Sequence, residues 1–313
     1  MPLTSPIEPG ELPLSRAGLD RDHGARERAG LLDELWVSPS TRVLPILDGQ
    51  AQLASPSRLA LFPASVVPRP AVSVYLGRTV ESRDDLPAGT PIIAALLEDA
   101  AHLAEVDWQH LRNVGHGLDA LDAGIFTQAL AILNWHSGFG FHPRTGHETV
   151  VESGGWVRRD PVSNEQVFPR TDPAVIVAVH DAEDRLLLGA NALWGTGRFS
   201  LLAGFVDPGE SLEAAVRREV EEESGLRVVE PRYVASQPWP FPSSLMLGFT
   251  AVVDQADPGE LRPDGEEIVA LRWFDRSELL AAVEAGEVLL PGRTSIARVM
   301  IQRWLGADPE AAR

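Results

Sequence analysis

The stretch Gly204–Leu226, GFVDPGESLEAAVRREVEEESGL, decides both the fold and the chemistry predicted for this chain. Ser211 is a favourable N-cap before Leu212, and Gly225 is a favourable residue just beyond a helix C-terminus. The sequence between them predicts a helix of about three and a half turns, at roughly 3.6 residues per turn.

The charged residues of this predicted helix fall on two faces. Three carboxylates, those of Glu219, Glu222 and Glu223, occupy an arc of roughly 100° that overlaps the apolar face. The other charges alternate in sign at four-residue spacing, as on an exposed ion-paired face: Glu213, Arg217 and Glu221. Carboxylates turned toward the body of a domain repel one another and lose hydration, which is costly unless a cation compensates. The pattern favours a site for Mg²⁺ or Mn²⁺ over a plain acidic patch, since hard cations prefer oxygen ligands.

The chain from about residue 171 mixes strand-like and helix-like segments without strict βαβ repetition. Ala174–Val179 (AVIVAV) is a continuous apolar run typical of a strand buried on both faces, and Arg185–Ala190 can pair with it through a turn at Asp181–Asp184. Further strands are predicted at Phe199–Ala203, Arg232–Ala235, Leu245–Val253 and Val269–Phe274, with helices at Arg276–Ala285 and Ser295–Trp304. These elements predict an α+β or α/β sandwich domain of about 130 residues.

The N-terminal part carries no motif that indicates chemistry. Residues 1 to about 20 are rich in Pro, Ser and Glu and are expected to be poorly ordered. A strand is predicted at Ala71–Leu76, with helices at Pro91–Leu103 and Leu118–Trp135. We predict four regions: an α+β domain for packing or dimerisation at 1–130, a loop-and-hairpin connector at 131–170, the sandwich domain at 171–305 and a tail at 306–313.

Composition narrows the possible functions. The chain has 313 residues, with 27 Lys and Arg against 45 Asp and Glu, so its net charge is −18. Such a charge argues against a broad basic surface for nucleic acid and against docking on anionic lipid. The chain has no cysteine, which excludes disulfides, Cys-ligated zinc and Cys nucleophiles. No secretory leader or apolar run of membrane-spanning length is visible, so a cytoplasmic globular protein is expected.

The stretch quoted first resembles the Nudix hydrolase signature at every fixed position: Gly204, Glu210, Arg218-Glu219-Val220, Glu222-Glu223 and Gly225-Leu226. The resemblance implies a C-terminal α/β/α sandwich with a mixed β-sheet, in a chain of the α+β class. Nudix enzymes hydrolyse a nucleoside diphosphate linked to another group, using Mg²⁺ or Mn²⁺. The resemblance implies that Glu219, Glu222 and Glu223 are metal ligands or the base, and that the carbonyl of Ala203 is a further metal ligand. It also implies that Arg218 orients a glutamate through a charge-assisted hydrogen bond.

A second segment, Ser236–Met246 (SQPWPFPSSLM), resembles the hallmark of the NADH pyrophosphatase branch, which includes enzymes that remove NAD caps from RNA. Its three prolines favour a rigid extended loop, and its aromatic rings can pack on flat bases. Taken without the signature, the segment is equally typical of a buried aromatic corner. The resemblance implies a dinucleotide pocket lined by Gln237, Pro238, Trp239, Pro240, Phe241, Pro242, Ser243 and Ser244.

The same resemblance assigns roles to residues elsewhere in the chain. Glu267 matches a further metal-binding glutamate, with Glu266 as the alternative register. Ala297 matches a substrate-contacting alanine. Phe168 stands where the branch usually has a tyrosine beside the substrate, so stacking is retained while a hydrogen bond is lost. A homodimer is implied as well, because that branch builds its substrate pocket across two subunits.

The connector departs from the branch, which commonly carries four zinc-binding cysteines there. The corresponding positions hold His142, Thr145, Asp160 and Ser163. Thr and Ser are poor zinc ligands, so we expect no structural zinc and a degenerate, zinc-ribbon-like connector held by packing alone. An improvised histidine site, built from His136, His142 and His147, is the less favoured reading.

The expected reaction is attack of water on one phosphorus of the NAD(H) pyrophosphate, which gives NMN(H) and AMP, with Glu222 or Glu223 as the base. Two other readings stay open: a Nudix hydrolase of another substrate, such as ADP-ribose or a dinucleoside polyphosphate, and a non-catalytic nucleotide-sensing module. For NAD-capped RNA, a local basic rim that includes Arg158, Arg159 and Arg170 would offset the acidic net charge.

Overall fold

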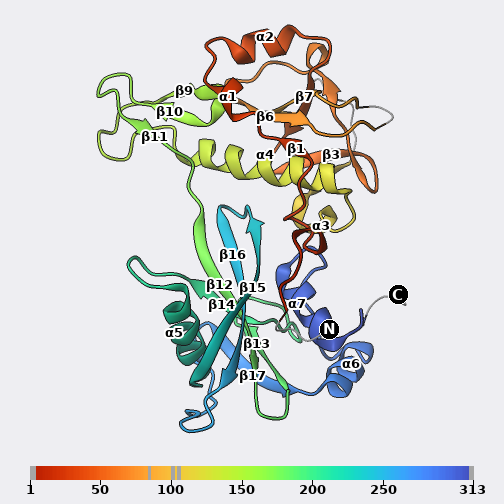
Figure 1. Ribbon diagram of the computed structural model, residues 1–313, viewed down its shortest axis with the longest axis vertical. Helices are drawn as coiled ribbons and strands as arrows, with labels where there is room; N and C mark the ends of the chain where they lie inside the picture. The colour runs from red at the N-terminus through yellow and green to blue at the C-terminus, as the bar shows by residue number, and fades with distance from the viewer. Residues whose placement is uncertain (1–4, 84–85, 100–102, 104–106, 310–313) are drawn as a thin grey trace. The chain divides into compact units, whose positions relative to one another are not determined.

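The computed structural model of the chain (Figure 1) describes residues 5–83, 86–99, 103 and 107–309. These residues form two compact units. Unit 1 comprises the N-terminal segment through Leu12, Asp172–Gln237 and the chain from Ser244 onward. Unit 2 comprises Pro13–Thr171 together with Pro238–Ser243. The four-part division drawn from the sequence remains a prediction, and the last four residues of its tail lie outside the described residues.

Unit 1 is built on a six-stranded mixed sheet around β12 (Asp172–His180). The strand order is β15-β16-β12-β13-β17, and β14 also pairs with β12. β12 runs parallel to β16 and antiparallel to β13 and β14. The bounds of its partners are β13 (Leu186–Asn191), β14 (Leu202–Phe205), β15 (Val228–Trp239), β16 (Ser244–Val253) and β17 (Ile268–Phe274).

Alternate residues of β12 enter two different apolar cores. Ile176 and Ala178 pack into the core that also holds α6 (Arg276–Glu284) and α7 (Ile296–Leu305). The valines that alternate with them pack into the core beneath α5 (Leu212–Ser224): Val175, Val177 and Val179. Helices therefore cover both faces of the sheet, which confirms the predicted sandwich and the strand buried on both faces.

Helix α5 begins and ends where its sequence predicts. The Ser211 hydroxyl oxygen accepts a hydrogen bond from the Ala214 backbone N–H at 3.2 Å. Gly225 takes a left-handed conformation with φ 70°, and its N–H donates to the Glu221 carbonyl at 2.8 Å. Both ends of the helix are thereby capped, and the orientation of the glutamates along it is fixed.

Unit 2 contains three sheets and the 19-residue helix α4 (Ala120–Gly138). Figure 1 shows α4 running along the five-stranded sheet, whose order is β1-β6-β7-β2-β5, and the strand predicted at Ala71–Leu76 corresponds to β6. The other sheets have the orders β4-β3-β8 and β11-β10-β9. None of the described helices is both long and apolar enough to cross a bilayer. The element bounds are β1 (Leu19–Asp20), α1 (His23–Arg26), α2 (Leu31–Val37), β2 (Arg42–Ile46), β3 (Gln50–Ser55), β4 (Arg58–Leu59), β5 (Phe62–Pro63), β6 (Ser73–Thr79), β7 (Pro91–Leu96), β8 (Trp108–His110), α3 (Leu111–Val114), β9 (Val150–Glu152), β10 (Val157–Arg159) and β11 (Gln166–Val167).

Two expectations for the N-terminal half are wrong. Pro91–Leu96 is the strand β7 rather than the start of a helix, because it pairs with β2 and β6 and buries apolar side chains on both faces. Residues 100–102 of the predicted helix lie outside the described residues. The segment before residue 20 is also ordered in part: Ile7 and Leu12 are buried in the unit 1 core, and the Ile7 N–H donates to the Val234 carbonyl at 2.8 Å.

Candidate functional site

Arg218 on α5 is the centre of an ion-pair network in unit 1. Its guanidinium holds both oxygens of Glu210, with nitrogen–oxygen distances of 3.0 and 2.8 Å. The same group donates to Glu219 at 2.8 Å, to Glu222 at 3.0 Å and to the Phe205 carbonyl at 2.9 Å. The paired hydrogen bonds to Glu210 raise the pKa of Arg218, and those from Arg218 lower the pKa of Glu210. Arg218 thus orients Glu219 and Glu222, the arrangement predicted from the sequence.

Gly204 leaves the space that the carboxylate of Glu219 occupies. A Cβ atom at this glycine would lie 2.0 Å from the Glu219 Cδ and 2.1 Å from one of its oxygens. No side chain fits at such a distance, so only glycine lets strand β14 lie directly against the carboxylate. Burial raises the pKa of Glu219 despite the opposing effect of Arg218.

Glu223 is the most deeply buried carboxylate of the predicted set. Its exposed fraction is 5%, and its Oε2 has no hydrogen-bond partner within the part of the chain that the structure describes. Burial, with the negative charges of Glu219 and Glu267, raises the pKa of Glu223 to about 8, although the Ala203 N–H donates to its carboxylate. Such a carboxylate either holds a proton near neutral pH or needs a cation beside it.

Glu267 lies at a turn organised by Asp264. The Asp264 Oδ1 accepts the backbone N–H groups of Glu266 at 2.7 Å, Glu267 at 2.9 Å and Ile268 at 3.0 Å. The Asn191 side-chain amide donates to Glu267 Oε1 at 3.3 Å. The negative charge of Glu267 contributes to the raised pKa values of Glu219 and Glu223. The choice of Glu267 over Glu266 as a metal ligand stays a prediction.

The donor set suits a hard divalent cation. Its members are carboxylates, together with the backbone of Ala203, and one buried carboxylate oxygen lacks a partner. In this conformation Arg218 engages Glu219 and Glu222. Over residues 5–83, 86–99, 103 and 107–309, no three acidic or histidine side chains are grouped tightly enough to form a ready-made metal cage.

The predicted dinucleotide loop is divided between the two units. Gln237 and Ser244 belong to unit 1, whereas Pro238–Ser243 belong to unit 2. Gln237 is fully buried, and its side-chain amide donates to the Thr294 carbonyl at 3.1 Å. The rings of Trp239 and Phe241 meet edge to face, with centroids 4.9 Å apart and an interplanar angle of 77°.

The other two predicted substrate residues differ in exposure. The Phe168 side chain is 59% exposed and lines a cavity of about 590 Å³ with His142, Arg144 and Glu165, all in unit 2. Ala297 lies in α7 of unit 1 and is only 2% exposed. An open aromatic ring can stack on a base, whereas a buried alanine can act on a substrate only by shaping the wall behind it.

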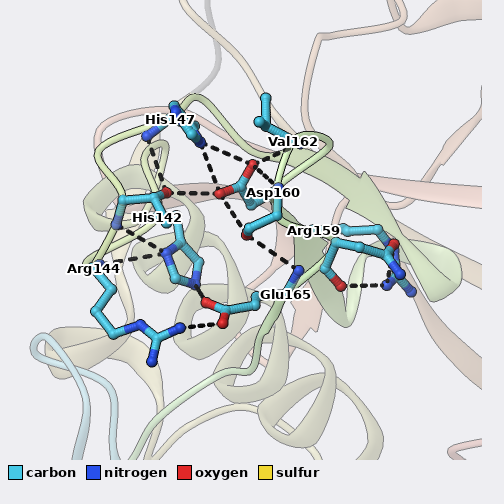
Figure 2. Close-up of polar contacts among 10 residues, drawn as sticks. His142, Arg144, His147, Arg159, Asp160, Val162 and Glu165 are labelled. Carbon is cyan, nitrogen blue, oxygen red and sulfur yellow. Dashed lines mark hydrogen bonds and ion pairs between the residues drawn. The ribbon is translucent and has the colours of Figure 1, made fainter.

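Asp160 organises the connector of unit 2, as Figure 2 shows. Its carboxylate is fully buried and accepts hydrogen bonds from the hydroxyls of Thr145 and Ser163, both at 2.7 Å, and from the Val162 N–H at 2.8 Å. The ring of His147 also contacts it, with Nδ1 3.0 Å from Oδ2. The expectation of a connector held by packing alone is therefore wrong. Burial by itself would raise the pKa of Asp160, but these hydrogen bonds together lower it.

The histidines of the connector also serve this hydrogen-bonded structure. His142 is buried, its Nδ1 accepts the Arg144 backbone N–H at 3.4 Å and its Nε2 lies 3.3 Å from Glu165 (Figure 2). The His136 Nε2 bonds to the Gly155 carbonyl at 2.8 Å, and burial lowers the pKa of His136 to about 4. A neutral His136 is the consequence at physiological pH.

The basic rim expected for RNA needs correction. Arg158 is buried, with its guanidinium bonded to the Thr149 hydroxyl at 2.6 Å and to His136 at 3.0 Å. Arg159 holds both oxygens of Glu152, at 2.9 and 2.8 Å. Arg158 therefore cannot contact a phosphate chain, because β10 directs its side chain into unit 2.

Sequence reasoning missed residues that support the site. Asp264 precedes Gly265, a pair that signals a turn, yet nothing local indicated that the turn would present Glu267. Asn191 follows an apolar strand and carried no signal; its role depends on a β-bulge that brings it beside Ile268.

Two protein-family models and several related proteins match the sequence of this chain. The model of the NUDIX domain matches residues 170–291, and the model of the NADH pyrophosphatase-like rudimentary NUDIX domain matches residues 40–135. The protein named NAD-capped RNA hydrolase NudC from Mycobacterium bovis (strain BCG / Pasteur 1173P2) is 38% identical over 310 residues, which cover 94% of this chain and 95% of that protein.

Two further proteins are similar to a smaller part of this chain. NAD-capped RNA hydrolase NUDT12 of Homo sapiens is 42% identical over 200 residues, covering 60% of this chain and 43% of that protein. A solved NUDIX hydrolase from Nitrosomonas europaea superposes with a TM-score of 0.41 at 23% identity, over 54% of this chain and 94% of that one.

Proposed function

This chain belongs to the Nudix hydrolase family, and we propose that it hydrolyses the pyrophosphate of NAD(H) to NMN(H) and AMP. The observation that carries the proposal is a pair of inward-facing carboxylates on α5, those of Glu219 and Glu223, and the Glu223 Oε2 has no hydrogen-bond partner among the described residues. A purely structural helix gains nothing from such a group, because an unpaired buried carboxylate destabilises the fold. A nucleotide-sensing module without turnover has no need for it either. The third member of the predicted set, Glu222, has a side chain that is 61% exposed, so the prediction that it faces the body of the domain is wrong.

We assign the cofactor as Mg²⁺ or Mn²⁺, held by Glu219, Glu222, Glu223, Glu267 and the carbonyl of Ala203. When bound, the cation neutralises charge on the pyrophosphate oxygens and lowers the pKa of the attacking water. Arg218 holds Glu219 and Glu222 in position from α5, and Asp264 holds the turn that presents Glu267.

Glu223 is the better candidate for the base. Its Oε2 accepts no hydrogen bond from the described residues, whereas Glu222 is bound by Arg218 and its side chain is 61% exposed. The water oxygen forms a bond to one phosphorus, the bridging P–O bond breaks, and the water proton passes to the carboxylate. The leaving phosphate carries the negative charge away.

The substrate contacts follow the loop and its neighbours. The rings of Trp239, Phe241 and Phe168 offer flat faces for the bases. Pro238, Pro240, Pro242, Ser243 and Ser244 form the backbone of the same pocket. Gln237 and Ala297 are buried, so we assign them to shaping the pocket wall.

NAD-capped RNA is the second candidate substrate, favoured by the names of the relatives that match most of the chain. The bond that is cleaved would be the same, and the RNA would lie beyond the phosphate. Because the net charge is −18 and Arg158 is buried, we expect few contacts to the RNA chain and only weak salt dependence. A homodimer follows from the resemblance and is proposed with it, and the cytoplasmic location expected from the sequence stays a proposal.

The test is incubation of the protein with NADH and Mg²⁺ or Mn²⁺, with product masses measured and EDTA as the control. NMNH and AMP formed only with the cation support the proposal. Rates on ADP-ribose and a dinucleoside polyphosphate that exceed the NADH rate would assign another substrate. Comparison of free NADH with an NAD-capped RNA at two salt concentrations ranks the two candidates.

A further inference from the structure

The aromatic loop of the proposed substrate pocket joins the paired strands β15 and β16 and is poor in backbone donors between them. Pro238, Pro240 and Pro242 remove three of its N–H donors. Outside the strand pairing, the Phe241 N–H donates to the Trp239 carbonyl at 2.7 Å. A loop so poor in donors needs its carbonyl groups satisfied from outside.

Asn134 on α4 supplies the missing donor. Its side-chain amide nitrogen lies 2.9 Å from the Pro240 carbonyl oxygen and 3.2 Å from the Pro242 carbonyl oxygen. One half-buried amide therefore bridges the two carbonyls on either side of Phe241 and fixes the loop on both sides of that ring.

Arg112 on α3 holds the two rings. Its guanidinium carbon lies 4.2 Å from the centre of the Phe241 ring and 5.2 Å from the centre of the Trp239 ring. A planar cation that contacts both rings stabilises their edge-to-face arrangement. Both rings also pack, half-buried, against the apolar core that includes α4.

The loop keeps an open side next to these contacts. Pro240, Phe241 and Pro242 line a cavity of about 340 Å³ together with His110, Asn134 and Ser137. The loop is thus fastened through a few directed contacts instead of being enclosed, so its shape depends on them.

We infer that Asn134 and Arg112 are positioning residues for the substrate: they clamp Trp239 and Phe241 in the arrangement that stacks a base of the dinucleotide. This inference rests on the proposed function, since it assigns the clamp to the same pocket. The inference gives unit 2 a part in substrate binding, because six residues of the loop, Pro238–Ser243, belong to unit 2. Neither residue touches the reacting phosphorus, so the effect should appear in KM and leave kcat nearly unchanged.

The experiment compares Asn134→Ala, Asn134→Asp, Arg112→Ala and Arg112→Lys with Trp239→Ala in the full chain, with NADH as substrate. Gln128→Ala is the matched control, since the Gln128 amide donates to the Leu76 carbonyl at 2.7 Å from the same helix α4 but does not contact the loop. We expect the Asn134 and Arg112 variants to raise KM about five- to tenfold with kcat within about twofold. Arg112→Lys should behave like Arg112→Ala, because lysine keeps the charge but not the planar face.

Affinity for Mn²⁺ measured without substrate should stay unchanged in all of these variants, which separates the clamp from the glutamate site. Arg112 is exposed, so we expect its variants to fold. Their KM values therefore test the clamp even if an Asn134 variant fails to fold. KM values equal to that of Gln128→Ala, with Trp239→Ala still impaired, would overturn the clamp and leave the proposed function intact. An unchanged KM in Trp239→Ala would show that the loop does not bind the substrate. The assignment of the loop to the pocket and the assignment of the clamp would then both fail.

Discussion

Glu223 in unit 1 and Asp160 in unit 2 are both buried carboxylates, with exposed fractions of 5% and 0%. Asp160 is surrounded by donors from Thr145, Ser163 and Val162, and its pKa is lowered. Glu223 keeps one oxygen without a partner among the described residues, and its pKa is raised to about 8 by burial and neighbouring carboxylates. The two sites therefore have similar burial and opposite electrostatics.

The difference shows that burial does not by itself reveal what a charged residue does. A carboxylate with its hydrogen bonds complete contributes to the structure around it, as Asp160 does in the connector. A carboxylate buried with its hydrogen bonds incomplete costs stability, and the fold retains such a group where chemistry needs it. A substitution of Glu223 should therefore lower activity, whereas a substitution of Asp160 should lower stability.

Glu223→Gln should have the largest effect on activity, because it removes the candidate base and a metal ligand together. We expect NADH hydrolysis to fall by about 10³-fold. Its metal-free thermal stability should not fall, since a neutral amide costs less to bury than an unpaired carboxylate. Hydrolysis rates with saturating Mg²⁺ and thermal unfolding in EDTA check both statements, and unchanged hydrolysis in a clean preparation would remove Glu223 from the site.

Gly204→Ala should come next. The added methyl would lie 2.0 Å from the Glu219 Cδ, so the carboxylate or strand β14 must move. We expect activity to fall by about 10²-fold, because a displacement of that size disturbs the catalytic geometry. Gly195→Ala is the control, since a Cβ there meets no atom within 4 Å. Equal rates for the two variants would show that the position of Glu219 is unimportant.

Arg218→Lys should weaken activity about tenfold or more, because lysine cannot hold Glu210 with two parallel hydrogen bonds and also reach Glu219. Arg217→Lys is the matched neighbour, since the exposed guanidinium of Arg217 donates to the Glu213 carbonyl at 3.1 Å. Steady-state rates on NADH measure the effect. A loss in Arg217→Lys as large as that in Arg218→Lys would argue for a general effect of the helix.

Asp160→Asn should affect stability and hardly alter the chemistry. The amide replaces one of the two acceptor oxygens with a donor that faces groups that donate, so part of the connector's hydrogen-bond network is lost. We expect the Tm to fall by about 5 °C or more, whereas Glu165→Gln, which alters an exposed ion pair, should change it little. Thermal unfolding measures both. Equal and small shifts would mean that the connector does not depend on the Asp160 hydrogen bonds.

Much of unit 1 could be predicted because its signals are local. Ser211 and Gly225 mark both ends of α5, and Ala174–Val179 is apolar enough to predict a strand buried on both faces. Helical geometry then predicts the inward orientation of Glu219 and Glu223, but not the exposure of Glu222, whose side chain Arg218 holds at the surface. These features depend on residues within a few positions of one another, and the structure reproduces them.

The failures arise where distant contacts decide. Pro91–Leu96 is apolar enough for either a helix or a strand, and its place between β2 and β6 decides for the strand. Asp160 is surrounded by hydroxyls and backbone groups up to fifteen residues away, and the pairing of β10 determines that Arg158 points inward. Pro238–Ser243 belong to unit 2, where they contact Asn134 and Arg112, both more than a hundred residues away in sequence.

The most direct test of the account is the free energy of unfolding of metal-free wild-type protein and Glu223→Gln between pH 5 and pH 8.5. The folded pKa of Glu223 is raised to about 8 from an ordinary value of 4.5, so its favourable contribution is complete below that ordinary value and is lost as the pH rises toward 8. We predict that the wild type loses stability relative to Glu223→Gln across this range and that Mn²⁺ restores it at pH 8 in the wild type alone. Parallel pH curves, with equal stabilisation of both proteins by Mn²⁺, would contradict the account.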